Sequence, residues 1–296
     1  SELEITKKTH SFFIKGDGLS IDSIQPKYQN SITESNVELK NNKFILVSLP
    51  KKFSFNYVDY NVKEFVSDYP EISFEILSDS LLKIKRGNYN LNRTIVIPYG
   101  VSLEIEGGAK LSLNKGVSLI VNGGLNINGS IENPVEINAF DSFGVIAAVG
   151  NKSTEVDINF LILSGGNEDS VNGAYFSGAL SLYSHDIVKM TNSIVSNNFG
   201  EDGLNIKSSK VLLKNNTFLS NYSDQVDLDN TIGHVSGNNF SVQNENSSNG
   251  DGLDLSGYKI SIQGNNFSYF KDKGISVGEE SEAVIFENTF SDNENG

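Results

Sequence analysis

The stretch "DGLDLSGYKISIQGNNFSYF" (residues 251–270) alternates apolar and polar residues in short runs that are separated by Gly, Asn and Ser. Similar stretches lie on both sides of it, and aligning them superposes one apolar residue from each. These residues are Leu204, Val226, Leu253 and Ile275, with Leu180 from a weaker copy. The steps between the first four are 22, 27 and 22 residues, and the long step contains the polar insertion "NENSSNG" (244–250).

A period near 22 residues with three short alternating strands per period predicts an all-β parallel solenoid, in which equivalent residues of successive coils stack. Each copy also ends in an Asn that is followed two residues later by an apolar residue. The Asn column comprises Asn192, Asn216, Asn238, Asn265 and Asn288. The apolar column comprises Ile194, Phe218, Phe240, Phe267 and Phe290. We expect the Asn side chains to bond from coil to coil in a turn, and the apolar side chains to fill the interior.

The period divides the chain into two parts. Residues 91–296 predict the β-helix, whereas residues 1–90 show no such period and predict a small mixed domain or cap. Within this first part we expect strands over 43–49 and 53–58 and a short helix over 61–72. The chain stops soon after a full repeat, which predicts an end-to-end or C-terminal partner over the last coil.

Composition excludes several classes of protein. The 296 residues contain no Cys, so no disulfide stabilises the chain. The net charge is −14, and all of it comes from the residues after position 90, which carry 25 acidic and 11 basic side chains. Such a body does not suit nucleic acid, whose phosphates need Lys and Arg. No apolar run approaches the ~20 residues of a membrane span, and no signal peptide opens the chain.

The strand "GLNIKS" shows which residues face outward. Because Leu204 and Ile206 point inward, Asn205 and Lys207 point outward, and the alignment extends this to every coil. The column at the turn before the strand contains Asp202, Asp224, Asp251 and Lys273. The next column contains Ser181, Asn205, Asp227, Asp254 and Ser276. The third contains Tyr183, Lys207, Asp229, Ser256 and Gly278, with Glu279 one position further on.

Five carboxylates therefore fall on two neighbouring coils. They are Asp224, Asp227, Asp229, Asp251 and Asp254. Carboxylates this close raise one another's pKa unless a cation joins them, and Ca²⁺ is the natural candidate for such oxygen ligands. The alternative is that Asp is favoured at a turn because it bonds the backbone, which explains only the first column well. Near Asp272 and Glu279, Lys273 suits either an ion pair or a base.

The motifs "DGLNI", "DQVDLD", "GDGLDLSG" and "DKGISVGE" make residues 93–296 resemble the pectate-lyase-like right-handed parallel β-helix superfamily, and within it bacterial cell-surface β-helix repeat proteins. The resemblance implies a right-handed coil, a secreted or cell-surface location and a polysaccharide partner. Lyases of this superfamily hold Ca²⁺ on acidic residues of the outer strand face, which Asp227, Asp229 and Asp254 match in kind. They use Arg or Lys as the base. The chain's two arginines, Arg86 and Arg93, lie far from these coils.

Two functions remain open at this point. The first is Ca²⁺-assisted β-elimination on a uronate polysaccharide, with Lys207 or Lys273 as the base and Asn205, Tyr183 and Glu279 binding substrate. The second is a non-catalytic surface protein that binds Ca²⁺ and glycan or has a structural role. The lack of an Arg base and of an obvious aromatic platform for sugars beside the acidic residues favours the second, whereas the precedent of the fold favours the first. His185 and His234 follow strands and are expected to be ordinary surface or turn residues.

Overall fold

The computed structural model describes residues 37–40, 43–46, 61–243, 250–278 and 281–295. The chain divides into two compact units, Ser1–Asp59 and Tyr60–Gly296. The described part of the first unit is an antiparallel pair of strands, β1 (Val37–Lys40) and β2 (Lys43–Leu46). Strand β2 lies within the strand expected over 43–49, whereas the strand expected over 53–58 lies outside the described residues.

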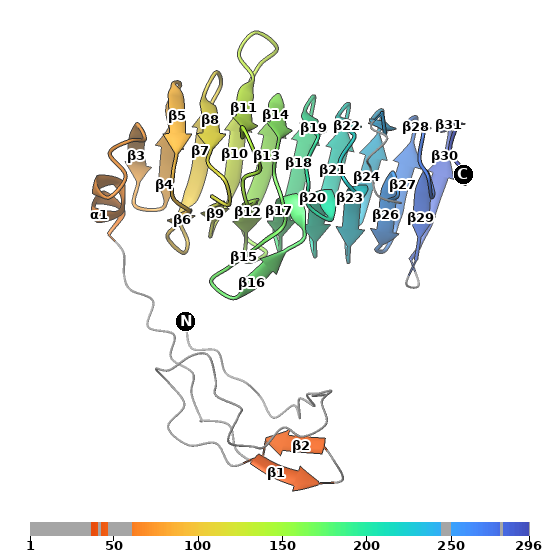
Figure 1. The fold of residues 1–296 in the computed structure, drawn as a ribbon, viewed down its shortest axis with the longest axis horizontal. Coiled ribbons are helices and arrows are strands. Elements are labelled where there is room, and N and C mark those ends of the chain that lie inside the picture. Colours follow the sequence, from red (N-terminus) through yellow and green to blue (C-terminus); the bar gives the residue numbers. More distant parts are fainter. Residues whose placement is uncertain (1–36, 41–42, 47–60, 244–249, 279–280, 296) are drawn as a thin grey trace. The chain divides into compact units, whose positions relative to one another are not determined.

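The second unit is a parallel β-helix with three sheets, through which each coil passes in turn (Figure 1). Sheet 1 contains β6 (Ile95–Ile97), β9 (Leu119–Val121), β12 (Ile146–Val149), β17 (Gly178–Tyr183), β20 (Asp202–Lys207), β23 (Asp224–Asp229), β26 (Leu253–Ser256) and β29 (Ile275–Val277). Sheet 2 contains β3 (Phe74–Ser78), β4 (Leu81–Ile84), β7 (Ser102–Glu106), β10 (Leu125–Asn128), β13 (Glu155–Asn159), β18 (Ile187–Thr191), β21 (Lys210–Lys214), β24 (Ile232–Ser236), β27 (Ile260–Gln263) and β30 (Ala283–Phe286). Sheet 3 contains β5 (Asn88–Leu91), β8 (Lys110–Leu113), β11 (Val135–Asn138), β14 (Leu161–Ser164), β19 (Ile194–Ser196), β22 (Thr217–Leu219), β25 (Asn239–Ser241), β28 (Asn266–Ser268) and β31 (Thr289–Ser291).

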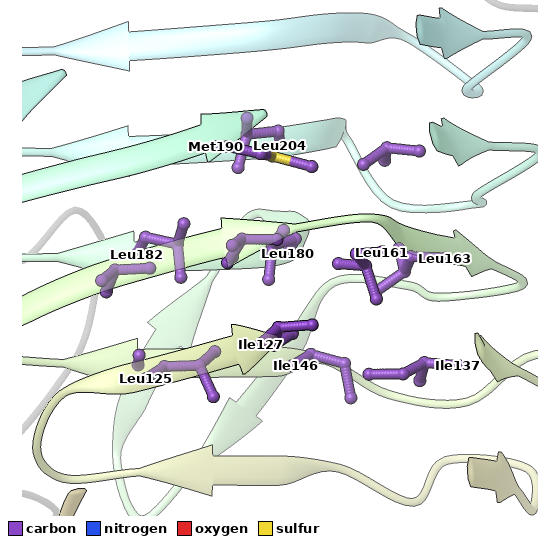
Figure 2. Packing of buried hydrophobic residues seen from close by; sticks show 14 of the residues in the cluster. Leu125, Ile127, Ile137, Ile146, Leu161, Leu163, Leu180, Leu182, Met190 and Leu204 are labelled. Atoms are coloured by element: carbon purple, nitrogen blue, oxygen red, sulfur yellow. The ribbon is translucent and has the colours of Figure 1, made fainter. Parts of the chain in front are cut away.

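The apolar register of sheet 1 is the one that the sequence predicts. Leu180 pairs with Leu204, Leu204 with Val226, Val226 with Leu253, and Leu253 with Ile275. Apolar side chains from the three sheets meet along the axis, where they form one continuous core (Figure 2). Equivalent positions stack from coil to coil, so the residues between them lie on the outer face in the same register.

The apolar column of sheet 3 is a stack of aromatic rings. Phe218, Phe240, Phe267 and Phe290 have successive ring centroids 5.1, 4.6 and 5.2 Å apart. The expected start of this column is wrong by one residue, because Val195, not Ile194, pairs with Phe218. Ile194 is instead 38% exposed.

The same shift affects the Asn column and has an identifiable cause. Asn238 Oδ1 accepts hydrogen bonds from the Asn216 backbone N–H (2.8 Å) and from its Nδ2 (3.0 Å), and the pattern continues to Asn288. In the coil before, Ser193 occupies the place of Asn216, and Asn192 occupies that of Asn215. Asn192 and Asn215 both have positive φ (50° and 57°), a conformation that Asn tolerates. Two adjacent turn positions thus favour Asn for different reasons.

The N-terminal end of the coils is closed by α1 (Val62–Ser67), which confirms the helix expected over 61–72 (Figure 1). Asn61 caps it, and Val62 and Phe65 are buried in the same core as the coils. Strand β4 then pairs in parallel with β7, so residues 61–90 belong to the unit of the coils. The structure therefore moves the boundary from residue 90, where the sequence placed it, to residue 59. The sequence did not show this because residues 61–90 form a helix, an antiparallel pair of strands and the first strands of the coils, none of which follows the period of about 22 residues.

At the other end, interior positions lie open. Ile285 and Phe290 are 44% and 40% exposed, whereas their register partners Ile262 and Phe267 are fully buried. Cover of this end by a partner stays a prediction. Within the described residues, no helix combines the length and apolar character needed to cross a bilayer.

Candidate functional site

The outer face of sheet 1 carries the acidic columns in the expected register. Asp227 pairs with Asp254, and Asn205 pairs with Asp227. Ser181 precedes Asn205 in this column and Ser276 follows Asp254. We use "the acidic strip" for the carboxylates on and beside β20, β23 and β26, namely Asp202, Asp224, Asp227, Asp229, Asp251 and Asp254. It extends over three neighbouring coils.

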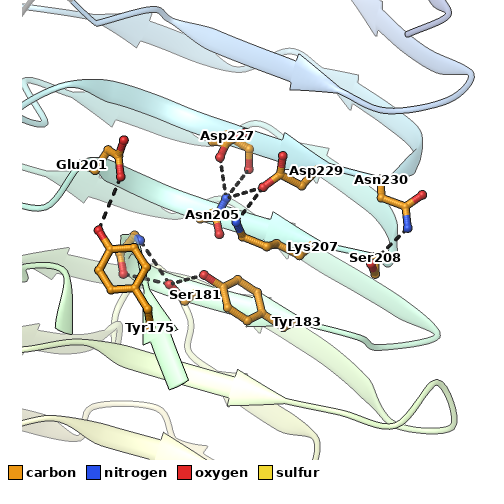
Figure 3. A network of polar contacts seen from close by, with 11 residues as sticks. Tyr175, Ser181, Tyr183, Glu201, Asn205, Lys207, Ser208, Asp227, Asp229 and Asn230 are labelled. Atoms are coloured by element: carbon orange, nitrogen blue, oxygen red, sulfur yellow. Dashed lines mark hydrogen bonds and ion pairs between the residues drawn. The ribbon is translucent and has the colours of Figure 1, made fainter. Parts of the chain in front are cut away.

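The centre of the acidic strip is a contact between an amide and a carboxyl group (Figure 3). Asn205 Nδ2 donates to Asp227 Oδ2 at 2.7 Å and lies 3.5 Å from Asp229 Oδ2. Asn205 is fully buried, and its Oδ1 has no hydrogen-bond partner. Asp227 is half-buried and is therefore both held by the protein and open to solvent.

Both lysines that the sequence proposes as bases are ion-paired. Lys207 Nζ lies 2.8 Å from Asp229 Oδ2 and 5.6 Å from the centre of the Tyr183 ring. Burial lowers the pKa of Lys207, but its hydrogen bond and charge interaction with Asp229 outweigh this and raise the pKa overall. Lys273 Nζ lies 2.6 Å from Asp272 Oδ2, a hydrogen bond that raises the Lys273 pKa. A base must be unprotonated, so this arrangement favours a positioning role for both side chains.

The column at the turn before the strand bonds the backbone. Asp224 Oδ1 accepts from the Asp251 N–H at 2.6 Å, and Asp251 Oδ1 accepts from the Lys273 N–H at 2.9 Å. This is the role expected of a turn Asp. Asp202 differs, because its side chain is 2% exposed and its Oδ2 has no hydrogen-bond partner.

Burial changes the protonation of the acidic strip. It raises the pKa of Asp202 to about 7 and that of Asp224 to about 6, with the neighbouring carboxylates contributing. The pKa of Asp227 is raised most, first by burial and then by the charges of Asp202, Asp229 and Asp254. The acidic strip therefore holds protons at neutral pH.

The predicted calcium ligands are neighbours but do not converge on one point. Among the residues that the structure describes, no three acidic or histidine side chains are arranged as metal ligands. Asp229 is engaged by Lys207, and Asp224 and Asp251 by backbone N–H groups. Glu279, which the sequence proposes for substrate binding, lies outside the described residues.

A hairpin that the sequence analysis missed lies beside the strip. Strands β15 (Asp169–Val171) and β16 (Ala174–Phe176) pair antiparallel across Asn172 and Gly173, which have φ of 51° and 81°. Asn-Gly favours a two-residue hairpin turn and could have revealed it. Phe176 is buried and stacks on the Tyr183 ring, with the centroids 5.6 Å apart.

This hairpin supplies an aromatic side chain that the sequence did not place at the site. Tyr175 is 54% exposed, and its hydroxyl donates to Glu201 Oε2 at 3.5 Å, one residue before Asp202 (Figure 3). The exposed ring of Tyr175 thus flanks the acidic strip, and the buried side chain of Phe176 holds its hairpin in place.

The two histidines near these coils have structural positions. His185 is a turn residue as expected, but it is buried and not on the surface. Its Nε2 donates to the Ala148 carbonyl at 3.1 Å, its Nδ1 lies 3.0 Å from Thr154 Oγ1, and burial lowers its pKa. His234 is exposed on β24 of sheet 2, away from the acidic strip, as expected.

Comparisons with known proteins address the fold. Residues 162–296 match a family described as right handed beta helix region. Among solved structures, ORF18 of Geobacillus virus E2 is similar over 88% of this chain at 11% identity with a TM-score of 0.43, and the match spans 66% of the length of that chain. No curated protein matches. The family match does not distinguish the pectate-lyase-like group from other β-helices. The three stacked parallel sheets and the match over residues 162–296 together show that this chain has a right-handed parallel β-helix fold.

Proposed function

We propose that the acidic strip is the site at which this protein processes a polysaccharide. The observation that carries the proposal is the register pairing of Asp227 with Asp254 on an open sheet face beside the exposed ring of Tyr175. Carboxyl groups can bond sugar hydroxyls, and an aromatic ring offers a flat apolar surface to a pyranose.

Proton transfer from Asp227 is the chemistry that the geometry supports best. Most glycosidases cleave the glycosidic bond with two carboxyl groups, of which one protonates the leaving oxygen. Burial and neighbouring carboxylates raise the pKa of Asp227, so it is the member of the strip best suited to donate a proton. In this proposal Asp254, its half-buried neighbour, is the second carboxyl group of the pair.

Ca²⁺-assisted β-elimination on a uronate polymer is the second candidate, and the five carboxylates on adjacent coils favour it. The donors are all oxygen atoms, as Ca²⁺ prefers. However, no three acidic or histidine side chains of the described residues converge as ligands, so we derive no step through calcium. Lys207 or Lys273 would also have to lose its proton while ion-paired. Non-catalytic glycan binding is the third outcome that an experiment must separate.

The test is to incubate the protein with a panel of uronate and neutral polysaccharides, with Ca²⁺ or with EDTA. Hydrolysis releases reducing ends without ultraviolet absorbance, whereas elimination also produces an absorbing unsaturated sugar. We expect reducing ends alone, falling about 10²–10⁴-fold in Asp227→Asn, which removes the acid. Asp157→Asn, on the exposed face of sheet 2, is the matched control and should retain full activity.

The other outcomes are equally clear. An absorbing product would replace hydrolysis with elimination. Retention of a polymer without any product, lost on substitution of the strip, would leave glycan binding. Neither product nor retention with any polymer of the panel would remove the proposal.

A further inference from the structure

We infer that the turns between sheets 1 and 2 form a binding site for two consecutive sugar residues of an acidic polysaccharide. Two cavities of about 260 and 270 Å³ adjoin there, and both are lined by Asn230. The first also reaches the acidic strip through Asp229. The inference rests on the proposed function in that it names the class of substrate, and it assigns residues that do not belong to the strip.

The first cavity has the chemistry of a site for one pyranose. Tyr258 contributes a ring that is 55% exposed, and Asp229 and Ser256 are register partners that add a carboxylate and a hydroxyl group. Asn230 donates from Nδ2 to Ser208 Oγ at 3.1 Å, which fixes the amide and leaves its Oδ1 for a ligand. A ring face with several polar groups at one side is a common arrangement in small-molecule sites.

A buried hydroxyl group without a hydrogen-bond partner lies beside this cavity. Gly257 lines the cavity, and the Thr231 hydroxyl lies next to it, since a Cβ on Gly257 would be 3.0 Å from Thr231 Oγ1. Thr231 is fully buried, and its Oγ1 has no hydrogen-bond partner in the structure. A buried hydroxyl without a partner is costly, so an ordered water or a ligand hydroxyl near this point would be stabilised.

The second cavity has the charge for an anionic sugar. Lys152 and Lys210 line it together with a single carboxylate, Asp186, which lies 2.9 Å from Lys210 Nζ. Lys152 Nζ donates to the Ser208 carbonyl and so carries a charge that no acidic partner neutralises in the described residues. His185, also in the lining, is held neutral by burial, so the cavity keeps a net positive charge. A carboxylate of the substrate would be attracted here.

Lys152 and Lys210 lie where they can offset the repulsion between an acidic substrate and this acidic protein. The residues after position 90 carry 25 acidic and 11 basic side chains, and a uronate polymer is repelled by such a body. The two cavities would hold its carboxylate at Lys152 and Lys210 and its next ring on Tyr258. The same cavity contains Asp229, so the polymer would continue from there onto the acidic strip.

The test measures the affinity of short oligosaccharides by calorimetry. The probes are tetramers of galacturonate, glucuronate, mannuronate and guluronate, each with its carboxyl-reduced counterpart. We expect one acidic tetramer to bind more tightly than its reduced form. The double variant Lys152→Gln/Lys210→Gln should weaken binding of the acidic tetramer at least tenfold and leave the reduced tetramer unchanged. Tyr258→Ala should weaken both forms by a similar factor.

Matched controls separate the site from general effects. Lys83→Gln/Lys110→Gln removes two lysines that line neither cavity and lie 2.9 and 2.8 Å from their acidic partners. Tyr269→Ala removes a ring of equal exposure in a turn outside both cavities. Both controls should bind as the unaltered protein does.

The inference is overturned if no tetramer binds, or if the Lys152/Lys210 and Tyr258 variants bind as tightly as the unaltered protein. Failure of the proposed function gives a different result. In that case tetramers bind with the expected dependence on these residues, but no polymer is cleaved and Asp227→Asn changes nothing.

Discussion

The buried carboxyl of Asp202 predicts an unusual dependence of stability on pH. Its pKa is raised from 3.8 to about 7 in the folded protein, chiefly by burial. Between these values the folded state binds a proton that the unfolded state has lost. Stability must therefore fall as pH rises from about 4 to about 7, the opposite of the usual contribution of a carboxylate. Asp202→Asn removes the ionisation and should abolish this part of the dependence.

The magnitude follows from the shift. A rise of about three pKa units corresponds to roughly 4 kcal/mol, the upper limit of the destabilisation at alkaline pH. At about pH 5 part of this cost is already present, so the advantage of Asp202→Asn should grow by roughly 2–3 kcal/mol between about pH 5 and about pH 8. In a unit of this size 1 kcal/mol shifts Tm by about 2–4 °C, so the Tm difference should grow by about 5–10 °C.

Thermal unfolding followed by far-ultraviolet circular dichroism at the two pH values measures this difference. Asp157→Asn, whose side chain is exposed, is the control and should change little at either pH. The reasoning is refuted if Asp202→Asn and the unaltered protein show the same change of Tm with pH. A lower Tm of Asp202→Asn at the higher pH would refute it equally.

Three further substitutions and titrations test the core, the turn ladder and the metal. Phe240→Ala removes a ring stacked 5.1 Å from Phe218, and we expect a loss of about 3–5 kcal/mol in urea unfolding. Asn238→Ala leaves the buried Asn216 backbone N–H without its acceptor and removes one of the two acceptors of its Nδ2, which should cost about 1–3 kcal/mol. An unchanged urea midpoint would show that the Asn ladder does not stabilise the fold. Calorimetric titration with Ca²⁺ tests the second candidate: saturable heat that Asp254→Asn diminishes would support elimination, whereas a flat titration of the unaltered protein would remove the predicted ion.

The periodic part of the fold could be predicted because each coil repeats the same physical requirement. An inward residue such as Leu204 must match Val226 in the next coil, so the alignment of apolar letters is also the alignment of strands. The one error in this alignment, at Asn192, arose because two adjacent turn positions both accept Asn. Residues 61–90 could not be assigned to the same unit, because their elements lack the period from which the rest was recognised.

The candidate site could be predicted only as far as stacking determines it. The pairing of Asp227 with Asp254 follows directly from the apolar register, since outward residues share it. The direction of a side chain does not follow from register, so the burial of Asp202 and the amide contact of Asn205 were not foreseen. The hairpin with Tyr175 is an insertion that belongs to no repeat, although the Asn-Gly pair of its turn can be recognised in the sequence.

The acidic strip contains two kinds of carboxylate, and this difference bears on function. Asp224 and Asp251 each bond a backbone N–H of the next coil, and the fold accounts for them. Asp227 and Asp254 are outward neighbours, and no backbone bond to the next coil explains either of them in the described residues. A solenoid places no demand on an outward position except compatibility with its neighbours, so the fold itself does not require two adjacent carboxyl groups here. Their place on an open face near an exposed aromatic ring is therefore the reason why we propose that these two groups serve a ligand.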